Sequence, residues 1–446
     1  MKFTDGQWVT KPEFDFLYPQ QVFDARFADG ELTVFVYTKP VSGRGQTLDQ
    51  ATLTLHFTSD LPDTIRVQAN HYEGIRPKGP AFACRHEDSL VRFAKNAQEL
   101  VFTAGRAAAV ITRAPFSIQY TWNGEVRTQS APRAMARISD QQGNAYMREQ
   151  LTLDVGEYVY GLGERFTAFC KNGQQVEMWN EDGGTASELT YKNIPFYLTN
   201  RNYGIFVDHP EKVSFEVASE QVERVQFSVS GEQLHYVFIG GDSLKQVLQN
   251  YCGLTGKPAL PPAWSFGLWL TTSFTTSYDE KTVNSFIDGM AQHDLPLHVF
   301  HFDCFWMEAC EWCNFEWDKA TFPDPRAMLE RLKAKGLKIC VWINPYIAQK
   351  SKLFQEGMEH HYLVEKVNGD VWQWDRWQAG MGLVDFTNPD ACRWYQSKLR
   401  ALLEMGVDCF KTDFGERIPT DVVWHNGADP QKMHNYYTYL YNQCVF

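Results

Sequence analysis

The hydrophobic pattern of this chain changes at residues 257–262, and that change restricts the possible folds more than any other feature. Before it, apolar and polar residues alternate in segments such as 32–38 and 51–57, as they do in half-buried antiparallel strands. After it, short apolar runs alternate with amphipathic stretches of helical period. The proline-rich segment between the two parts predicts an extended linker. A chain of 446 residues is long for one domain and suggests two or three, and the change of pattern predicts domains at 1–256 and 257–446.

The first part predicts a β-sandwich. Segments 116–120 and 125–127 flank Asn123-Gly124, which is a strong signal for a tight hairpin turn. Segments 213–217 and 225–229 repeat the alternation of apolar and polar residues. Many short strands separated by turn residues are typical of two packed antiparallel sheets.

The second part predicts a parallel sheet built from strand–helix units. The expected strands are residues 265–270, 297–302, 337–342 and 407–410, and the expected helices are residues 279–293, 325–335, 351–361, 389–405 and 430–446. A (β/α)8 barrel needs eight such right-handed units and roughly 250 residues. We therefore predict a fold that is α/β and all-β, namely an N-terminal β-sandwich followed by the first half of a (β/α)8 TIM-type barrel. The chain looks truncated midway through the barrel, and the open edge of a half-barrel predicts aggregation or association, including a homo-oligomer.

Composition excludes several classes of partner. A formal net charge of −12 argues against nucleic acid and anionic membranes, which attract basic surfaces. No stretch approaches about 18 uninterrupted apolar residues, and no secretory signal peptide is visible. Ten irregularly spaced cysteines fit a reducing compartment, so we expect a cytoplasmic protein. Cys310 and Cys313 have no second pair at zinc-ribbon spacing, and we expect neither a metal nor a cofactor.

The segment from Gly406 to Glu416 is the strongest candidate for chemistry. Its apolar run predicts a buried strand that delivers Lys411, Asp413 and Glu416 to the carboxyl end, where α/β barrels have their active sites. The chain also has 14 Trp, whose rings can stack on the apolar faces of sugars, so a carboxylate here suggests work on sugars. From the residues alone, a structural Lys–Asp ion pair that closes the strand stays open as an alternative.

Several sequence blocks resemble glycoside hydrolase family 31, the retaining α-glucosidase and α-xylosidase family. The matching blocks occur in the order of the family and span essentially the whole chain: Tyr160-Gly-Leu-Gly-Glu-Arg-Phe166, Trp179-Asn-Glu-Asp-Gly-Gly184, Phe302-Asp-Cys-Phe-Trp306, Trp342-Ile-Asn-Pro345 and Lys411-Thr-Asp-Phe-Gly-Glu416. The resemblance is closest to the bacterial α-xylosidase branch, to whose first barrel strand Leu268-Trp-Leu-Thr-Thr-Ser-Phe274 is similar.

The resemblance implies a role for each matching residue. Asp413 matches the nucleophile, which forms a covalent glycosyl-enzyme in the retaining mechanism. Lys411, two residues away, would favour the charged form of Asp413. Asp303 and Asp182 match binders of sugar hydroxyl groups, with Asp182 on a loop of the sandwich, and Trp342 matches the aromatic wall of the −1 subsite. The structural alternatives are a strand-end cap for Asp303, a turn former for Asp182 and a core residue for Trp342.

The pair Cys304-Phe305 bears on the substrate, because it resembles the xylosidase branch rather than the glucosidase branches. Xylose lacks the C6 hydroxymethyl group of glucose, so a pocket can reject glucose by filling that volume. Phe274 is a candidate for the filler. We therefore favour α-xylosidase over α-glucosidase, while the alternative for Cys304 is a small buried thiol.

The acid/base aspartate of the family lies on the second half of the barrel, and no residue of this chain matches it. Glu416, close to Asp413, is expected to orient other groups. The resemblance thus implies a metal-independent retaining α-xylosidase that releases non-reducing α-linked xylose from small oligosaccharides, with the fragment alone inactive. A non-catalytic carbohydrate-binding remnant stays open as a rival, as does a lyase or transglycosylase with the same nucleophile.

Overall fold

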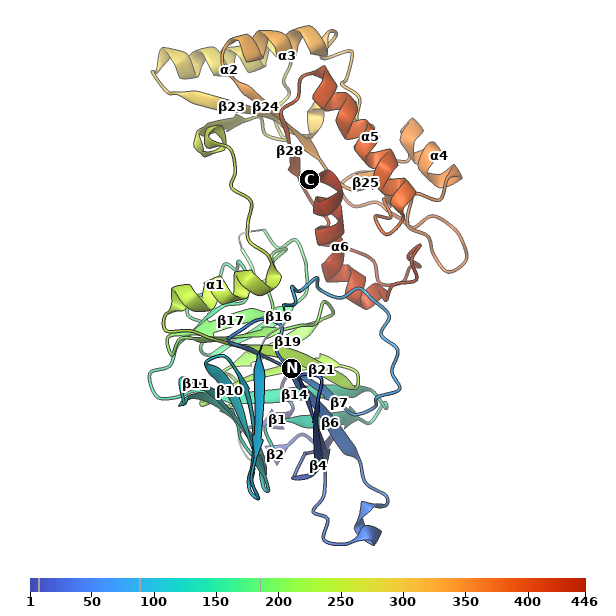
Figure 1. The fold of residues 1–446 in the computed structure, drawn as a ribbon. Helices are drawn as coiled ribbons and strands as arrows, with labels where there is room; N and C mark the ends of the chain where they lie inside the picture. Colours follow the sequence, from blue (N-terminus) through green and yellow to red (C-terminus); the bar gives the residue numbers. More distant parts are fainter. Residues whose placement is uncertain (7–8, 88–89, 185) are drawn as a thin grey trace. The chain divides into compact units, whose positions relative to one another are not determined.

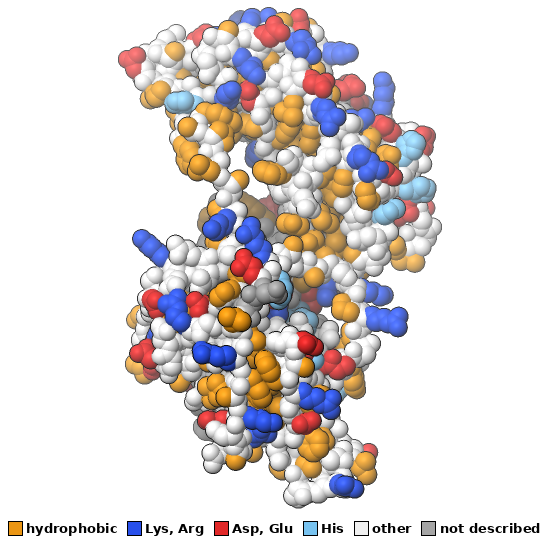
Figure 2. Space-filling view, in the orientation of Figure 1, with side chains coloured by type: hydrophobic (Ala, Val, Ile, Leu, Met, Phe, Trp, Pro, Cys, Tyr) orange, Lys and Arg blue, Asp and Glu red, His pale blue; other side chains and the backbone are white. Residues whose placement is uncertain are grey.

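The computed structural model describes residues 1–6, 9–87, 90–184 and 186–446 (Figure 1). It divides into two compact units, Met1–Pro258 and Ala259–Phe446. On the face seen in Figure 2, Lys and Arg side chains are interspersed with Asp and Glu. Within the described residues, no helix is both long and apolar enough to cross a membrane.

The first unit is built on two large antiparallel sheets. The strands of one sheet, in spatial order, are β16 (Gln174–Met178), β19 (Val213–Val217), β20 (Arg224–Ser230), β14 (Ala145–Thr152), β12 (Glu125–Ser130), β11 (Phe116–Trp122), β10 (Ala107–Arg113), β9 (Glu99–Ala104) and β8 (Val91–Lys95), with β13 (Ala136–Asp140) pairing with β14 and with β3 (Phe14–Leu17). Those of the other are β15 (Val159–Gly161), β17 (Phe196–Thr199), β18 (Tyr203–Val207), β21 (Gln233–Gly240), β7 (Thr64–Asn70), β6 (Thr52–Thr58), β5 (Glu31–Tyr37) and β4 (Gln21–Ala28). The remaining elements of this part are β1 (Thr4–Asp5), β2 (Val9–Thr10), the short helix η1 (Arg44–Thr47) and α1 (Leu244–Thr255).

The hydrophobic core of the first unit gathers side chains from both sheets. Along β5, Leu32, Val34 and Val36 are fully buried while the residues between them are partly exposed, which is the expected period of two. The predicted hairpin is confirmed, since β11 and β12 pair across Asn123-Gly124, whose two φ angles are 52° and 80°.

The core of the sandwich also encloses a carboxyl group. The side chain of Glu149 is fully buried, and its Oε1 accepts hydrogen bonds from Ser130 Oγ and from the backbone N–H of Gln150, both at 2.8 Å. Its Oε2 accepts one from the hydroxyl of Tyr236 at 3.1 Å, and that hydroxyl lies 2.7 Å from the hydroxyl of Tyr120. Burial raises the pKa of Glu149 from 4.5 to about 7.

The raised pKa of Glu149 predicts a loss of stability with rising pH. The folded protein holds this proton up to about pH 7, whereas the unfolded chain releases it near 4.5. The contribution of Glu149 to the free energy of unfolding is therefore complete below pH 4.5 and decreases through pH 7, by an amount on the order of 3 kcal/mol. Urea unfolding between pH 4 and pH 8, a range chosen to include both pKa values, measures this contribution. In Glu149→Gln, the free energy of unfolding should lack the decrease that Glu149 causes with rising pH. Glu125→Gln, at a site whose side chain is 75% exposed, is the control, and equal pH profiles for wild type and Glu149→Gln would contradict the assignment.

The second unit contains a four-stranded parallel sheet in the order β22 (Leu268–Thr271), β23 (Leu297–Phe302), β24 (Lys338–Ile343) and β28 (Cys409–Thr412). The other elements of this unit are η2 (Ala263–Phe266), α2 (Glu280–Gln292), η3 (Cys304–Trp306), α3 (Pro325–Ala334), α4 (Lys352–Glu359), α5 (Pro389–Met405), α6 (Pro430–Val445) and a small sheet of β25 (Tyr346–Ile347), β27 (Met381–Leu383) and β26 (Gln373–Trp374). The helices of this unit begin with capping side chains that satisfy a free backbone N–H. The side chain of Asn388, for example, accepts a hydrogen bond from the N–H of Asp390, and Pro389 follows as the first helical residue.

The two faces of the parallel sheet differ in character. One face contributes Phe300, Phe302, Ile339, Val341 and Ile343 to a core that also contains residues of α2, α3 and α5. Figure 1 shows α2 and α3 over β23 and β24. Because side chains alternate along a strand, the residues between these apolar ones point to the opposite face, and they include His301, Cys340, Trp342 and Lys411.

Two predicted strand boundaries are wrong. Residues 263–266 form a 3₁₀ turn closed by the hydrogen bond from Gly267 N to the carbonyl oxygen of Trp264, so the first strand begins only at Leu268. The last strand runs from Cys409 to Thr412 rather than from 407 to 410, because the Asp408 side chain binds the N–H of Ile339. Lys411 therefore lies within the strand and not beyond its end.

Candidate active site

Four of the residues predicted for the site gather at the carboxyl ends of β23, β24 and β28. These strands pair in register, with Phe302 beside Val341 and with Trp342 beside Lys411. Asp303 directly follows β23, and Asp413 directly follows β28. Because carboxyl ends of parallel strands share one edge of the sheet, the side chains of Asp303, Trp342, Lys411 and Asp413 lie at the same edge.

The carboxylate of Asp413 is held by one oxygen. The indole Nε1–H of Trp342 donates to Oδ2 of Asp413 at 2.6 Å, and Nζ of Lys411 lies 4.0 Å from the same oxygen. The backbone N–H of Asp413 donates to the carbonyl oxygen of Ile343 at 2.9 Å, which extends the pairing of the two strands by one bond. The Asp413 side chain is 35% exposed, and its Oδ1 has no hydrogen-bond partner in the described part of the chain. One oxygen is thus anchored and the other faces outward.

The chain turns sharply after Asp413. Phe414 and Gly415 have φ angles of 60° and 99°, both in the left-handed region. The ring of Phe414 packs edge-on against Trp342, with centroids 6.0 Å apart, and lies 4.3 Å from that of Trp377. A Cβ on Gly415 would lie 3.1 Å from Cγ2 of Thr438, so glycine is required by both its conformation and its surroundings.

The turn takes Glu416 into the interior, where only 4% of the residue is exposed. Burial first, and then the charge of Glu416, raise the pKa of the Tyr346 hydroxyl, so the two groups are electrostatic neighbours. A buried carboxylate is poorly placed to exchange protons with a substrate, and the orienting role of Glu416 stays a prediction.

Asp303 begins the short helix η3. Its Oδ1 accepts a hydrogen bond from the N–H of Cys304 at 2.8 Å, and its backbone carbonyl accepts one from the hydroxyl of Tyr278 at 2.7 Å. The strand-end cap that the sequence left open as an alternative is therefore present. Cys304 is 1% exposed, and burial together with the Asp303 carboxylate raises the pKa of its thiol.

The aromatic residues predicted to select the substrate are more exposed. Phe305 is 38% exposed and lines a cavity of about 460 Å³ together with Tyr278 and Asp318. Phe274 is 66% exposed, and no ring of a described residue packs against it. None of Asp303, Trp342 and Asp413 lines this cavity, so the roles of Phe305 and Phe274 in selecting the substrate stay predictions.

Asp182 belongs to the first unit, between β16 and β17. Its Oδ1 accepts a hydrogen bond from the N–H of Gly184 at 3.3 Å, as expected of a turn former. Gly183 packs so closely that an added Cβ would lie 2.4 Å from Cβ of Leu189, which explains the glycine. The role of Asp182 in binding sugar stays a prediction.

Sequence reasoning missed three residues near Asp413. Trp312 and Trp377 extend the aromatic packing, with the Trp312 ring 4.9 Å from Trp342. Both lie in irregular segments, so no periodic signal marked them. His301 was detectable, because it stands two residues before Asp303 on the same strand and so points to the same face.

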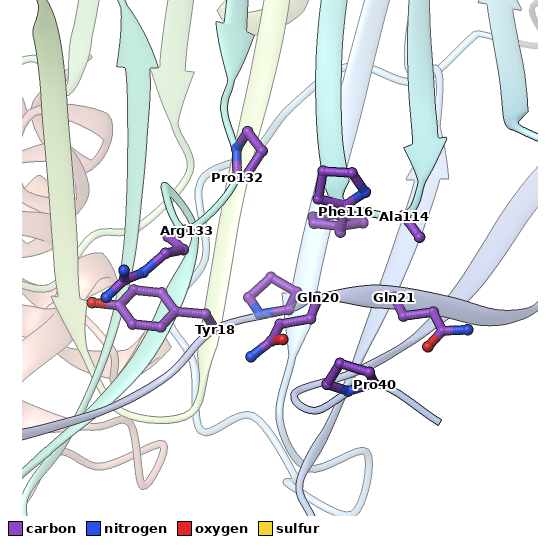
Figure 3. A pocket seen from close by; sticks show the side chains of 10 residues that line it. Tyr18, Gln20, Gln21, Pro40, Ala114, Phe116, Pro132 and Arg133 are labelled. Atoms are coloured by element: carbon purple, nitrogen blue, oxygen red, sulfur yellow. The ribbon is translucent and has the colours of Figure 1, made fainter. Parts of the chain in front are cut away.

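The first unit has a pocket of about 590 Å³, and none of the predicted site residues lines it (Figure 3). Tyr18 is the aromatic side chain beside Arg133 in this pocket. The Arg133 guanidinium lies 4.8 Å from the centroid of the Tyr18 ring, and Phe16 stacks on the same ring at 5.4 Å. Protein groups already cover this ring, so it is not a free platform for a sugar.

Potential metal ligands do not cluster in the part of the chain that the structure describes. No group of three or more His, Cys, Asp or Glu side chains there could hold a metal ion. All ten cysteines are free.

The turn after Asp413 predicts a clear stability difference between two glycines. Gly415→Ala should lower the free energy of unfolding by about 1–2 kcal/mol, because alanine is strained at this φ and crowds Thr438. Gly289→Ala is the matched control, since Gly289 lies inside α2 with nothing within 4 Å of an added Cβ. That change should raise stability by about 0.5–1 kcal/mol. Denaturant unfolding measures both, and an equal effect of the two substitutions would contradict the reading of the turn.

Comparisons with known proteins show the family to which the chain belongs. Residues 258–446 match the model for the glycosyl hydrolases family 31 TIM-barrel domain, and residues 52–216 match the glycosyl hydrolase 31 N-terminal galactose mutarotase-like domain. The chain is 50% identical over 449 residues to the alpha-xylosidase XylQ of Lactiplantibacillus pentosus, covering 100% of this chain and 59% of that protein. It is 45% identical over 474 residues to an alpha-xylosidase of Emericella nidulans, covering 100% of this chain and 60% of that one. The chain thus spans about three fifths of the length of these curated relatives.

Solved structures show the same fold. A GH31 dextranase of Flavobacterium johnsoniae complexed with glucose matches with a TM-score of 0.83 at 23% identity, over 96% of this chain and 52% of that one. A GH31 alpha-xylosidase from a soil metagenome complexed with xylose matches with a TM-score of 0.77 at 18% identity, over 95% of this chain and 63% of that one. The predicted fold class, a β-sandwich followed by part of a TIM-type barrel, is confirmed.

Proposed function

The chain belongs to glycoside hydrolase family 31, and from this premise we propose that it carries the nucleophile side of a retaining α-xylosidase. The observation that carries the proposal is the arrangement of Asp413, whose Oδ2 is bound by Trp342 Nε1 at 2.6 Å with Lys411 Nζ at 4.0 Å. The two relatives named as alpha-xylosidases, at 50% and 45% identity, support the choice of substrate.

In the proposed first step, Oδ1 of Asp413 attacks the anomeric carbon of an α-xyloside. The bond from that carbon to the leaving group breaks as the carboxylate forms a covalent β-xylosyl ester, and water later hydrolyses the ester with overall retention. The Trp342 N–H fixes Oδ2 and the charge of the Lys411 ammonium attracts the same oxygen, so that Oδ1 is presented to the substrate. None of the 446 residues is assigned the acid/base role, so we propose that leaving groups which require protonation turn over slowly in this chain alone.

The proposed specificity rests on the loop after β23. Phe305, 38% exposed, and the buried Cys304 stand directly after Asp303, and Phe274 is available from the loop after β22. Bulk at this position would exclude the C6 hydroxymethyl group that distinguishes glucose from xylose. We propose that Asp303 and Asp182 bind hydroxyl groups of the sugar and that Glu416 orients its buried neighbours. The free cysteines favour a cytoplasmic location.

One observation favours a second candidate function, that of a carbohydrate-binding remnant. The chain spans about three fifths of the two relatives, and a non-catalytic carbohydrate-binding remnant would need no proton donor. The two candidates differ in whether Asp413 forms a covalent bond to a sugar.

Trapping of the glycosyl-enzyme tests the proposal. α-Xylosyl fluoride has a leaving group that needs little protonation, so the wild-type chain should release fluoride and gain the mass of one xylosyl group. After quenching in acid, intact-mass measurement and peptide mapping should locate the group on Asp413. Asp413→Ala should show neither release of fluoride nor the gain in mass. β-Xylosyl fluoride is the control for selectivity between the two anomers. A slower reaction with α-glucosyl fluoride is expected if the site selects xylose. Absence of label on the wild-type protein would favour the binding remnant.

The indole donor should matter separately from the bulk of the ring. Trp342→Phe keeps an aromatic ring but removes the hydrogen bond to Asp413, so xylosylation should slow about 10- to 100-fold, as expected for a hydrogen bond to a charged group. Trp374→Phe is the matched control, because Trp374 Nε1 is a buried donor with no partner among the described residues. Equal rates of xylosylation for the Trp342 and Trp374 variants would contradict the proposed role of the Trp342 hydrogen bond.

A further inference from the structure

His301 is a buried histidine on the same face of the sheet as Lys411, and the proposed function does not use it. It lies on β23, two residues before Asp303, and only 5% of it is exposed. Its backbone is in register with Thr271 on one side and with Cys340 on the other. A polar ring at this depth needs hydrogen-bond partners.

The hydrogen bonds around Thr271 define which nitrogen of His301 carries the proton. The Thr271 hydroxyl donates its single hydrogen to the carbonyl oxygen of Thr272 at 3.0 Å. Its oxygen lies 2.5 Å from Nδ1 of His301, and with the hydroxyl hydrogen directed at Thr272 we assign it as the acceptor from an Nδ1–H. Burial, and after it the charge of Lys411, lower the pKa of His301 to about 4, and the ring is neutral at neutral pH. Nε2 is then a bare acceptor.

That acceptor is unpaired. Nε2 of His301 is buried without a hydrogen-bond partner among the described residues. Its neighbour Cys340 does not serve, because the Cys340 thiol is hydrogen-bonded to Cys409, which raises its pKa. An unsatisfied buried acceptor destabilises a protein, so a donor within reach would be bound.

Lys411 is such a donor. Its ammonium has three N–H groups. Within the described part of the chain its charged partner is Asp413, at 4.0 Å, which is longer than a hydrogen bond. The Lys411 side chain is 47% exposed and flexible enough to turn, and its charge already acts on His301.

We propose that His301 is a positioning residue for Lys411, in which Nε2 accepts a hydrogen bond from the ammonium and holds it beside Oδ2 of Asp413. Its effect on the reaction rests on the proposed function, because His301 acts through Lys411 and does not touch the sugar. The Thr271–His301–Lys411–Asp413 chain then connects β22 to β28 across the face of the sheet.

Nitrogen NMR of the imidazole rings tests the contact without any substrate. In the ¹⁵N-labelled 446-residue protein, the signals of His301 are identified by their loss in His301→Gln. We expect the Nδ1–H tautomer and an Nε2 resonance that moves in Lys411→Met. Lys338→Met is the control, since Lys338 is paired with Asp408. An Nε2 resonance that is unchanged in Lys411→Met would overturn the proposal.

A double-mutant cycle tests the consequence for xylosyl transfer. His301→Leu should slow labelling by α-xylosyl fluoride about tenfold, as expected for loss of a hydrogen bond to a charged group. His301→Gln keeps an acceptor oxygen and should therefore recover most of the rate of labelling. In the Lys411→Met background, His301→Leu should change the rate by less than about twofold. The same loss in both backgrounds would show that His301 acts independently of Lys411. Absence of labelling in the wild type would contradict the proposed function, while the NMR result would still decide the contact.

Discussion

The in-register pairing of β24 with β28 is the constraint on which the candidate site depends. It places Trp342 beside Lys411 and, through the bond from Asp413 N to the carbonyl oxygen of Ile343, carries the alignment one residue further. The indole and the carboxylate, 71 residues apart in the chain, then meet at 2.6 Å without any adjustment of the backbone. If β28 shifted by one residue against β24, Lys411 would turn to the opposite face of the sheet from Trp342.

The surroundings of this pair keep it rigid. The ring of Trp342 is 2% exposed and is packed by Trp312 and Phe414, so the donor has little freedom to move away from Asp413. The left-handed turn at Phe414 and Gly415 directs the following chain inward and buries Glu416. A site held in this way is preorganised, which is the main requirement for stabilising charge in a reaction. The proposed contact of His301 with Lys411 would also hold the Lys411 ammonium in a fixed position.

The two units use buried polar groups differently. In the sandwich, Glu149 has hydrogen bonds from Ser130, Gln150 and Tyr236, and its pKa is still raised because the carboxyl group is buried. On the parallel sheet, His301 has one satisfied and one unpaired nitrogen among the described residues. A satisfied network is typical of structure, whereas an unpaired buried acceptor on the same face as Lys411 suggests a function.

The sequence by itself determined the features that depend on neighbouring residues. The period-two strands, the Asn123-Gly124 hairpin and the cap at Asn388 follow from local rules, and the ordered blocks identified family 31, which the matches to both domain models confirm. Only the tertiary structure decided the contacts between distant segments. It placed Trp312 on Trp342, paired Thr271 with His301, and delayed the start of the last strand to Cys409, because the Asp408 side chain binds Ile339 N. These contacts join residues 30 to 71 positions apart, or lie in segments without a period, and a local pattern carries no information about which distant side chain fills a given space.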